Sequence, residues 1–188
     1  MPPGCLPTLW RDDQRFADSY LTAHPGYYVT GDGGYRDRDG YLYVMGRIDD
    51  VINVAGHRLS TGEMEEVLAS HPAVAECAVI AVNDELKGQI PRGFVVLKAG
   101  VRADPAALSA ELVQLIRDQI GPVATPRRVD VIAALPKTRS GKILRKTMRG
   151  IADGRHEPVP STIEDPAALD ALRPVLAIRG GSENLRVR

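Results

Sequence analysis

Apolar and polar residues alternate most regularly between residues 47 and 154, where short β-type runs follow amphipathic helical stretches. Four apolar runs predict strands: 51–54, 75–82, 93–98 and 128–133. Apolar residues spaced three and four apart predict three helices, beginning near Ser60, Asp104 and Ser140. These elements lack the long βαβ regularity of a doubly wound parallel sheet. We therefore expect an α+β fold, a compact layer sandwich that covers residues 47–154.

Local signals mark the starts of these helices. Ser60 followed by Glu63 has capping-box spacing, and Asp104-Pro105 is an N-cap followed by a first-turn proline. Ser140-Gly141 opens the third predicted helix, which Ile143, Leu144, Met148 and Ile151 stripe. This start would leave Lys142 near the unpaired N–H groups of that helix, where anions bind readily.

The two ends of the chain differ from this central segment. Residues 27–30 and 41–44 are short β-type runs with a turn at Asp39-Gly40, and they predict a hairpin that needs a partner surface. We expect residues 27–45 to be mobile or sticky. After residue 154 come a proline-containing linker, a short helix from Asp165 to Pro174 and a polar tail at 178–188, which we expect to be disordered. The predicted domains are therefore 1–46, 47–154 and 155–188.

Composition excludes some classes of function. The 188 residues carry 24 Lys+Arg and 24 Asp+Glu, so the zero net charge gives no global reason to bind nucleic acid or an anionic membrane. No apolar run approaches the roughly 20 residues that span a bilayer, and the start has no signal-peptide layout. Cys5 and Cys77 make no disulfide framework, and Cys77 lies in an apolar run that favours a buried, reduced thiol. We expect a cytoplasmic protein.

Three polar, glycine-rich clusters are candidates for chemistry: 28–32 (YVTGD), 46–58 (GRIDDVINVAGHR) and 135–142 (LPKTRSGK). A carboxylate after a strand and a glycine can accept hydrogen bonds from a vicinal diol, although Gly-Asp is also a common turn. Two arginines that flank a strand suit phosphate or carboxylate, although they also suit a surface ion pair. The third cluster is not a Walker loop. Residues 137–149 are alternatively a solvated basic helix face or a nucleic-acid patch, but no aromatic residues interleave with the charges.

Taken in order, YVTGD, GRIDDVINVAGHRLSTGEMEEVLASHP, LKGQ and LPKTRSGKILR resemble the adenylate-forming acyl-CoA synthetases. The resemblance is closest to propionyl-CoA synthetase, then acetyl-CoA synthetase, and it runs from residue 1 to about residue 166, through STIEDP. It implies a C-terminal domain with a small mixed or antiparallel sheet and flanking helices, preceded by a β-hairpin remnant of the large N-terminal domain. The ATP-phosphate loop and acyl pocket of that domain are not among these residues.

The resemblance implies an AMP-forming acid–thiol ligase that uses ATP, Mg²⁺ and coenzyme A. A short-chain carboxylate, propionate or else acetate, attacks the α-phosphate of ATP to give an acyl-adenylate and pyrophosphate. Coenzyme A thiol then displaces AMP, after the C-terminal domain has rotated. We expect the isolated chain to be inactive in adenylation and to need the N-terminal adenylation domain as its partner, in cis or in trans.

The resemblance also implies the roles of individual residues. Asp32 corresponds to the carboxylate that holds the ATP ribose, Arg47 and Arg58 to arginines that contact the nucleotide, and Asp49 to the hinge. Lys142 corresponds to the catalytic lysine of adenylation. In relatives this lysine is reversibly acetylated, so a lysine acetyltransferase and a deacetylase are implied partners.

Two further sets of residues follow from the same resemblance. Coenzyme A-binding positions are Ala55, where acetyl-CoA synthetases tend to have Ser, Gly56 beside the pantetheine tunnel, and Arg117. Residues at the end of the 61–70 helix resemble a cation site: Ala69, His71 and Val74. For these three residues a simple proline-terminated helix is the favoured alternative. Alternatives for the whole chain are a stand-alone regulatory or nucleic-acid-binding module that uses residues 137–149, and a degenerate reading frame with no independent role.

Overall fold

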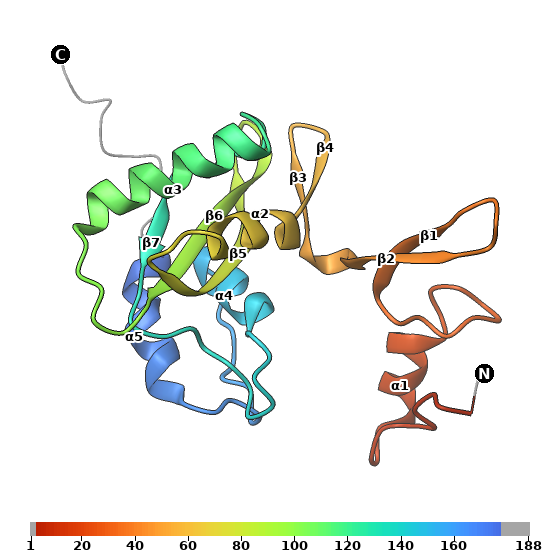
Figure 1. The fold of residues 1–188 in the computed structure, drawn as a ribbon. Coiled ribbons are helices and arrows are strands. Elements are labelled where there is room, and N and C mark those ends of the chain that lie inside the picture. The colour runs from red at the N-terminus through yellow and green to blue at the C-terminus, as the bar shows by residue number, and fades with distance from the viewer. Residues whose placement is uncertain (1–2, 178–188) are drawn as a thin grey trace. The chain divides into compact units, whose positions relative to one another are not determined.

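The computed structural model describes residues 3–177, except for the side chains of Met45 and Asp49. The polar stretch 178–188, for which the sequence predicts disorder, lies outside the described residues. The chain divides into two compact units, Met1–Asp49 and Asp50–Arg188 (Figure 1).

The first unit contains a helix and a hairpin. Helix α1 (Asp13–Tyr20) precedes the antiparallel strands β1 (Asp32–Arg36) and β2 (Leu42–Arg47). The second hairpin strand is close to the prediction, but the first is wrong, because residues 27–30 precede β1 instead of forming it. The reason is an aromatic cluster: Tyr28 stacks on Tyr20 with ring centroids 5.1 Å apart, and both pack near the buried Phe16.

The second unit is built on a five-stranded mixed sheet. Its strands are β3 (Val51–Val54), β4 (His57–Ser60), β5 (Val74–Asp84), β6 (Gly88–Leu97) and β7 (Val129–Val131). The order is β4-β3-β6-β5, all antiparallel, and β7 adds to β6 in parallel. The 3-10 helix η1 (Ile48–Asp50) leads into β3.

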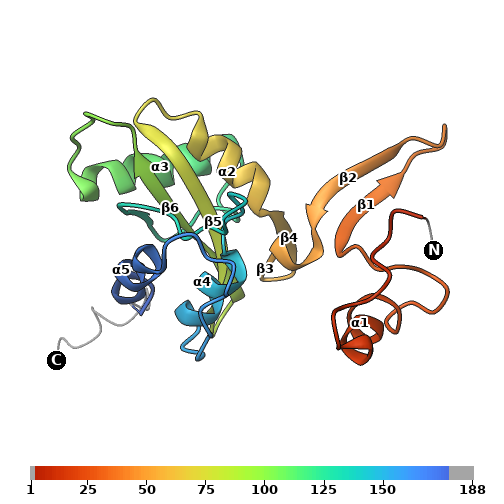
Figure 2. The ribbon, with the colours of Figure 1, turned by 90° about the horizontal axis from the view of Figure 1, so that it is seen from below.

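Helices cover both faces of this sheet (Figure 2). On one face, α2 (Thr61–Ala69) and α3 (Pro105–Gln119) share a buried core with Val79, Ala81 and Val95. On the other, α4 (Arg145–Ala152) and α5 (Pro166–Ala177) share a second core with Ala78, Ile80 and Phe94. Successive residues of β5 and β6 thus point to opposite cores, as the period of a strand requires. The α+β prediction of a small mixed sheet with flanking helices is confirmed.

Several boundaries differ from the prediction. Strand β4 was not predicted, and β6 begins five residues before the predicted strand at 93–98. Ser60 is the N-cap of α2, but its side chain makes no capping hydrogen bond, so the predicted capping box does not form. Helix α5 continues through Pro174 to Ala177. Within residues 3–177 no helix has both the length and the apolar character needed to cross a bilayer.

The last boundary that differs bears on function. Helix α4 begins at Arg145, not at Ser140, because residues 137–143 form a turn closed by a bridge between Lys137 and Ile143. The prediction that Lys142 lies at a helix N-terminus is therefore wrong. Its surroundings are those of a tight turn.

Candidate functional site

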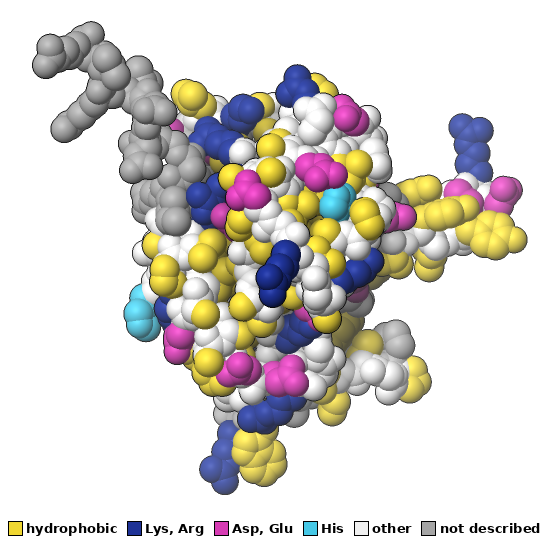
Figure 3. All heavy atoms as spheres, turned by 60° about the vertical axis from the view of Figure 1, so that its left-hand side comes forward, with side chains coloured by type: hydrophobic (Ala, Val, Ile, Leu, Met, Phe, Trp, Pro, Cys, Tyr) yellow, Lys and Arg dark blue, Asp and Glu magenta, His cyan; other side chains and the backbone are white. Residues whose placement is uncertain are grey.

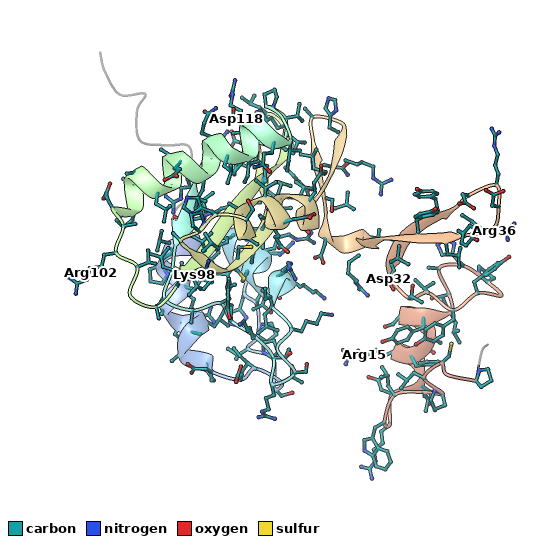
Figure 4. All side chains as sticks on the ribbon, in the orientation of Figure 1. Arg15, Asp32, Arg36, Lys98, Arg102 and Asp118 are labelled. Carbon is teal, nitrogen blue, oxygen red and sulfur yellow. The ribbon has the colours of Figure 1, made fainter. Side chains whose placement is uncertain are left out.

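Asp32 and Arg47 lie directly opposite each other in the β1–β2 pair. Nη1 of Arg47 donates a hydrogen bond to the carbonyl oxygen of Thr30 at 2.9 Å. Gly31 has a φ of +79°, and a Cβ on it would lie 2.8–2.9 Å from the guanidinium of Arg47. Gly31 therefore leaves room for the arginine, while the exposed Asp32 carboxylate marks one end of the same strand pair (Figure 4). A carboxylate and a cation side by side can hold a diol and an anion.

Asp49 lies in η1, at the last position of the first unit. A residue between two compact units can absorb backbone torsion changes when one unit rotates. The hinge role implied for Asp49 stays a prediction.

Ala55 and Gly56 form the two-residue turn between β3 and β4, and Arg58 is an exposed residue of β4. Both turn residues have positive φ, +48° and +88°, the conformation of a primed hairpin turn. A Cβ on Gly56 would meet no described atom within 4 Å, so crowding from this chain does not require the glycine. The hairpin is tied to the β5–β6 turn, because the amide of Ala55 donates to the carbonyl of Lys87 at 2.9 Å.

Lys142 lies at the end of a hydrogen-bonded turn. The amide of Thr138 donates to the Lys142 carbonyl at 2.8 Å, and the amide of Lys142 donates to Thr138 Oγ1 at 3.1 Å. Gly141, at φ +81°, closes the turn by donating to the Thr138 carbonyl at 2.7 Å. The Lys142 side chain is exposed and takes part in no ion pair within residues 3–177. An ordered backbone thus presents a solvated ammonium group.

Arg117 is exposed in the last turn of α3, before Gly121. A cation there favours the negative end of the helix dipole, so the position has a structural reason beside the implied coenzyme A role. No hydrogen bond or ion pair within the described part of the chain connects Arg117 with Lys142 or Arg58. The residues implied for the nucleotide, for coenzyme A and for catalysis thus come from four segments: the β1–β2 pair, the β3–β4 hairpin, α3 and the Lys142 turn.

The implied cation site lies at the C-terminal end of α2, where Ala69 is the last residue. Both ring nitrogens of His71 are engaged: Nδ1 accepts from the Ala73 amide at 3.2 Å, and Nε2 lies 3.1 Å from Glu111 Oε1. The His71 carbonyl accepts from the Val74 amide at 3.1 Å. These contacts give His71 a structural role between α2 and α3, and the cation site stays a prediction. Residues 3–177 contain no group of three or more His, Cys, Asp or Glu side chains that could hold a metal ion.

Glu65 on α2 organises the surroundings of Arg145 and Cys77. Its carboxylate accepts from Arg145 at 3.0 and 2.7 Å and from the amide of Val79 at 2.8 Å. Cys77 is half-buried, and its Sγ donates to the Glu65 carbonyl at 3.2 Å. Burial, and then the Glu65 charge, raise the pKa of the Cys77 thiol to about 11, while Arg145 opposes them. A thiol that stays protonated at neutral pH is a poor nucleophile, so Cys77 is structural.

The pKa of Asp84, at the β5–β6 turn, is lowered below its ordinary value. The main cause is the hydrogen bond from the Lys87 amide, which burial opposes and the Leu86 amide and Arg127 reinforce. Asp84 therefore holds the turn that supports the Ala55–Gly56 hairpin.

The basic segment 137–149 is partly neutralised. Lys137 pairs with Glu76 at 2.6 Å, and Arg145 pairs with Glu65 at 2.7 Å. On the face seen in Figure 3, Lys and Arg side chains are interspersed with Asp and Glu instead of forming one basic area. These contacts weigh against the nucleic-acid alternative, which needs a continuous basic patch.

Sequence reasoning missed the residues that support the site. Gly31 carried a usable signal, because a glycine before a site carboxylate can provide positive φ. The pairing of Glu65 with Arg145 had none, because it joins residues far apart in the chain. Thr138 carried a weak local signal, because a threonine hydroxyl can bond to a nearby backbone amide, here that of Lys142.

Comparisons with known proteins agree with this arrangement. Residues 63–142 match the family model of the AMP-binding enzyme C-terminal domain. An uncharacterized protein of Pseudomonas aeruginosa is 60% identical over 181 residues, covering 95% of this chain and 28% of that protein. The mitochondrial acyl-CoA synthetase short-chain family member 3 of Mus musculus is 47% identical over 176 residues, 94% of this chain and 26% of that protein. Acetyl-coenzyme A synthetase of Penicillium chrysogenum is 46% identical over 172 residues, 90% of this chain and 25% of that protein.

The chain thus spans about a quarter of the length of these curated relatives. Among solved structures, the amide bond synthetase McbA from Marinactinospora thermotolerans matches with a TM-score of 0.61 and 34% identity, over 76% of this chain and 28% of that one. ATP-bound MatB from Rhodopseudomonas palustris shares the fold, with a TM-score of 0.66 and 24% identity over 80% of this chain and 29% of that one. Residues 63–142 therefore match the AMP-binding enzyme C-terminal domain, and the chain as a whole is similar to the C-terminal quarter of relatives named acyl-CoA synthetase and acetyl-coenzyme A synthetase.

Proposed function

We propose that this chain is the C-terminal portion of an AMP-forming short-chain acyl-CoA ligase, which prefers propionate and accepts acetate. The exposed ammonium group of Lys142 on its ordered turn carries the proposal. The relatives named acyl-CoA synthetase short-chain family member 3 and acetyl-coenzyme A synthetase support the substrate class.

In the first half-reaction a carboxylate oxygen bonds to the α-phosphorus of ATP, and the bond to the bridging oxygen breaks to release pyrophosphate. Negative charge builds up on the phosphoryl oxygens as two anions meet. Catalysis of such a transfer is mainly positioning and charge stabilisation. Lys142 supplies a positive charge at those oxygens, while Asp32 holds the ribose hydroxyls and Arg47 and Arg58 contact the nucleotide.

In the second half-reaction coenzyme A sulfur attacks the acyl carbonyl carbon, and AMP leaves. We assign coenzyme A to the Ala55–Gly56 hairpin and Arg117, and we place the change between the two half-reactions at Asp49. Mg²⁺ would enter with the ATP phosphates, because Mg²⁺ in such enzymes is held largely by substrate phosphates and water.

Acetylation of Lys142 would remove its charge and stop adenylation, since the neutral amide cannot stabilise phosphoryl oxygens. The exposure of Lys142 on a turn suits modification by a lysine acetyltransferase and reversal by a deacetylase.

The test is pyrophosphate release with propionate or acetate, ATP and Mg²⁺. The chain would be assayed alone, with an adenylation domain of a relative added in trans, and as a chimera in which it replaces the matching quarter of the Penicillium enzyme. We expect no turnover alone, and turnover in the chimera that Lys142→Ala and Lys142→Gln abolish. Lys146→Ala, an exposed lysine four residues away, is the matched control and should stay active. Full adenylation by Lys142→Ala would refute the assignment.

A further inference from the structure

We infer that residues 161–165, here named the strap, position Lys142 for adenylation, with Ile163 as their buried anchor. The inference rests on the proposed function of Lys142 and deepens it. The family match ends at residue 142, so the strap lies outside the matched segment.

The strap is hydrogen-bonded along the Lys142 turn. The amide of Arg139 donates to the Thr162 carbonyl at 3.0 Å, and the amide of Glu164 donates to the Lys137 carbonyl at 2.9 Å. Between these two bonds, Ile163 forms an antiparallel bridge with Thr138. The strap thus pairs with the turn through an isolated bridge, and the Lys137–Ile143 bridge closes the turn itself.

One apolar side chain holds the strap in place. Ile163 is 6% exposed, whereas the other four strap residues are exposed. Glu164 and Asp165 line an open pocket of about 300 Å³ together with Ala75 and Val96 of the sheet. The strap is therefore fixed at Ile163 and by its backbone bonds, not by packing along its whole length.

Helix α5 fixes the far end of the strap. The Asp165 carboxylate accepts from the Ala167 amide at 2.9 Å in the first turn of the helix. Three leucines of α5 are buried, Leu169, Leu172 and Leu176, and the last two belong to the second core. Arg92 on β6 donates to the carbonyls of Val175 and Leu176 at 2.6 and 3.1 Å, which anchors the helix end to the sheet.

This arrangement controls where the ammonium group can reach. Lysine has a flexible four-carbon stem, so the position of its charge depends on how firmly its backbone is held. Misplacement of a reacting group by about 1 Å can cost roughly a hundredfold in rate. Loosening the strap should therefore slow adenylation by about tenfold to a hundredfold, and it should leave thioester formation, which does not use Lys142, unchanged.

Amide hydrogen exchange on the 188-residue chain tests the positioning without any activity. Ile163→Ala should speed exchange at Arg139 and Lys142, while the core amides of β5 and β6 keep their protection. Val159→Ala, at a linker residue that is 44% exposed, is the matched control and should change nothing. Should Ile163→Ala unfold the chain, Ile163→Val provides the milder change, with a smaller increase at the same amides. Unchanged amide exchange at Arg139 and Lys142 in both Ile163 variants would overturn the inference that the strap positions Lys142.

Activity in the chimera then separates this inference from the proposed function. Ile163→Ala should lower kcat for adenylation with little change in KM for the carboxylate, Ile163→Val should restore most of it, and thioester formation from added acyl-adenylate should persist. If Lys142→Ala adenylates normally, the proposed role of Lys142 fails, and the exchange result still shows whether the strap orders the Lys142 turn. If Lys142→Ala is inactive but Ile163→Ala keeps full kcat, only the strap is refuted.

Discussion

Replacing Arg92 with methionine should release helix α5 from the sheet. The Arg92 side chain is nearly buried; its Nε donates to Asp130 at 2.9 Å, and its two terminal nitrogens donate to the carbonyls of Val175 and Leu176. Burial lowers the pKa of Arg92, and Asp130 opposes that effect. The charged guanidinium is therefore stable inside the protein only because its partners compensate for the loss of water. Methionine keeps much of the apolar volume and removes every donor.

The magnitude follows from these contacts. A hydrogen bond to a charged group contributes about 1.5–3 kcal/mol, and the bonds to Asp130, Val175 and Leu176 would be lost. Two effects make the net loss of stability smaller than this sum. The variant no longer has to desolvate a guanidinium, and Asp130 keeps a second partner in Arg128 at 2.7 Å. We expect Arg92→Met to lower the free energy of unfolding by about 2–4 kcal/mol, a large share of a typical domain's stability.

Urea denaturation followed by circular dichroism measures this loss, and amide exchange in α5 shows where it arises. The matched control is Arg128→Met, which removes the other partner of the same carboxylate. The side chain of Arg128 is 31% exposed, so its loss should cost about 1 kcal/mol or less. Equal losses for the two variants, or unchanged exchange in α5 after Arg92→Met, would show that Arg92 does not hold the helix.

Three further predictions concern single positions. Ala55→Asn should stabilise the chain by about 0.5–1 kcal/mol in urea denaturation, because alanine is disfavoured at φ +48° and Asn-Gly suits a primed turn; a loss of stability would contradict this. The thiol of Cys77 should titrate near pH 11 when thiolate absorbance is followed. Because folding raises its pKa from 9.0, its contribution to stability should be complete below pH 9 and lost as the pH rises to about 11. A midpoint near 9 would show that burial does not raise the pKa of this thiol. Gly31→Ala should destabilise the β1–β2 hairpin by about 1–2 kcal/mol and displace Arg47, seen as faster amide exchange, whereas Gly33→Ala, with an ordinary 3.5 Å contact, should cost less.

Elements with strong local signals could be predicted from the sequence. Helix α3 begins after Asp104, whose carboxylate accepts from the Ala107 amide at 2.9 Å, and Pro105 occupies the first turn as expected. Its apolar stripe is buried at Leu108, Leu112 and Ile116. Here the cap, the proline and the stripe all specify the same structure.

Elements that depend on distant partners could not be predicted. Helix α1 was missed because it is short, and its aromatic pair, Phe16 and Tyr20, is completed by Tyr28 from beyond the helix. The start of β6 was missed because Pro91 and Arg92 obscure a buried strand. The turn before α4 was assigned to the helix because two of its backbone hydrogen bonds go to Thr162 and Glu164 in the strap, 23 and 27 residues later in the chain.

The candidate residues were easier to find than their geometry. The motifs placed Asp32 and Arg47 fifteen residues apart, and only the bulged β1–β2 register brings them face to face. Likewise the sequence identified Lys142, but it did not show that the hydroxyl of Thr138 accepts a hydrogen bond from the Lys142 amide. The type of a residue indicates which chemistry its side chain can perform. The strand register and the turn type depend on contacts that a single sequence does not show.

The backbone hydrogen bonds that join residues 137 and 139 to the strap have a practical consequence for protein engineering. A hybrid enzyme whose crossover falls soon after residue 142 would combine the Lys142 turn of one parent with the strap of the other. Crossovers placed beyond Ala177 would transfer both pieces together, with the Arg92 contacts that hold them.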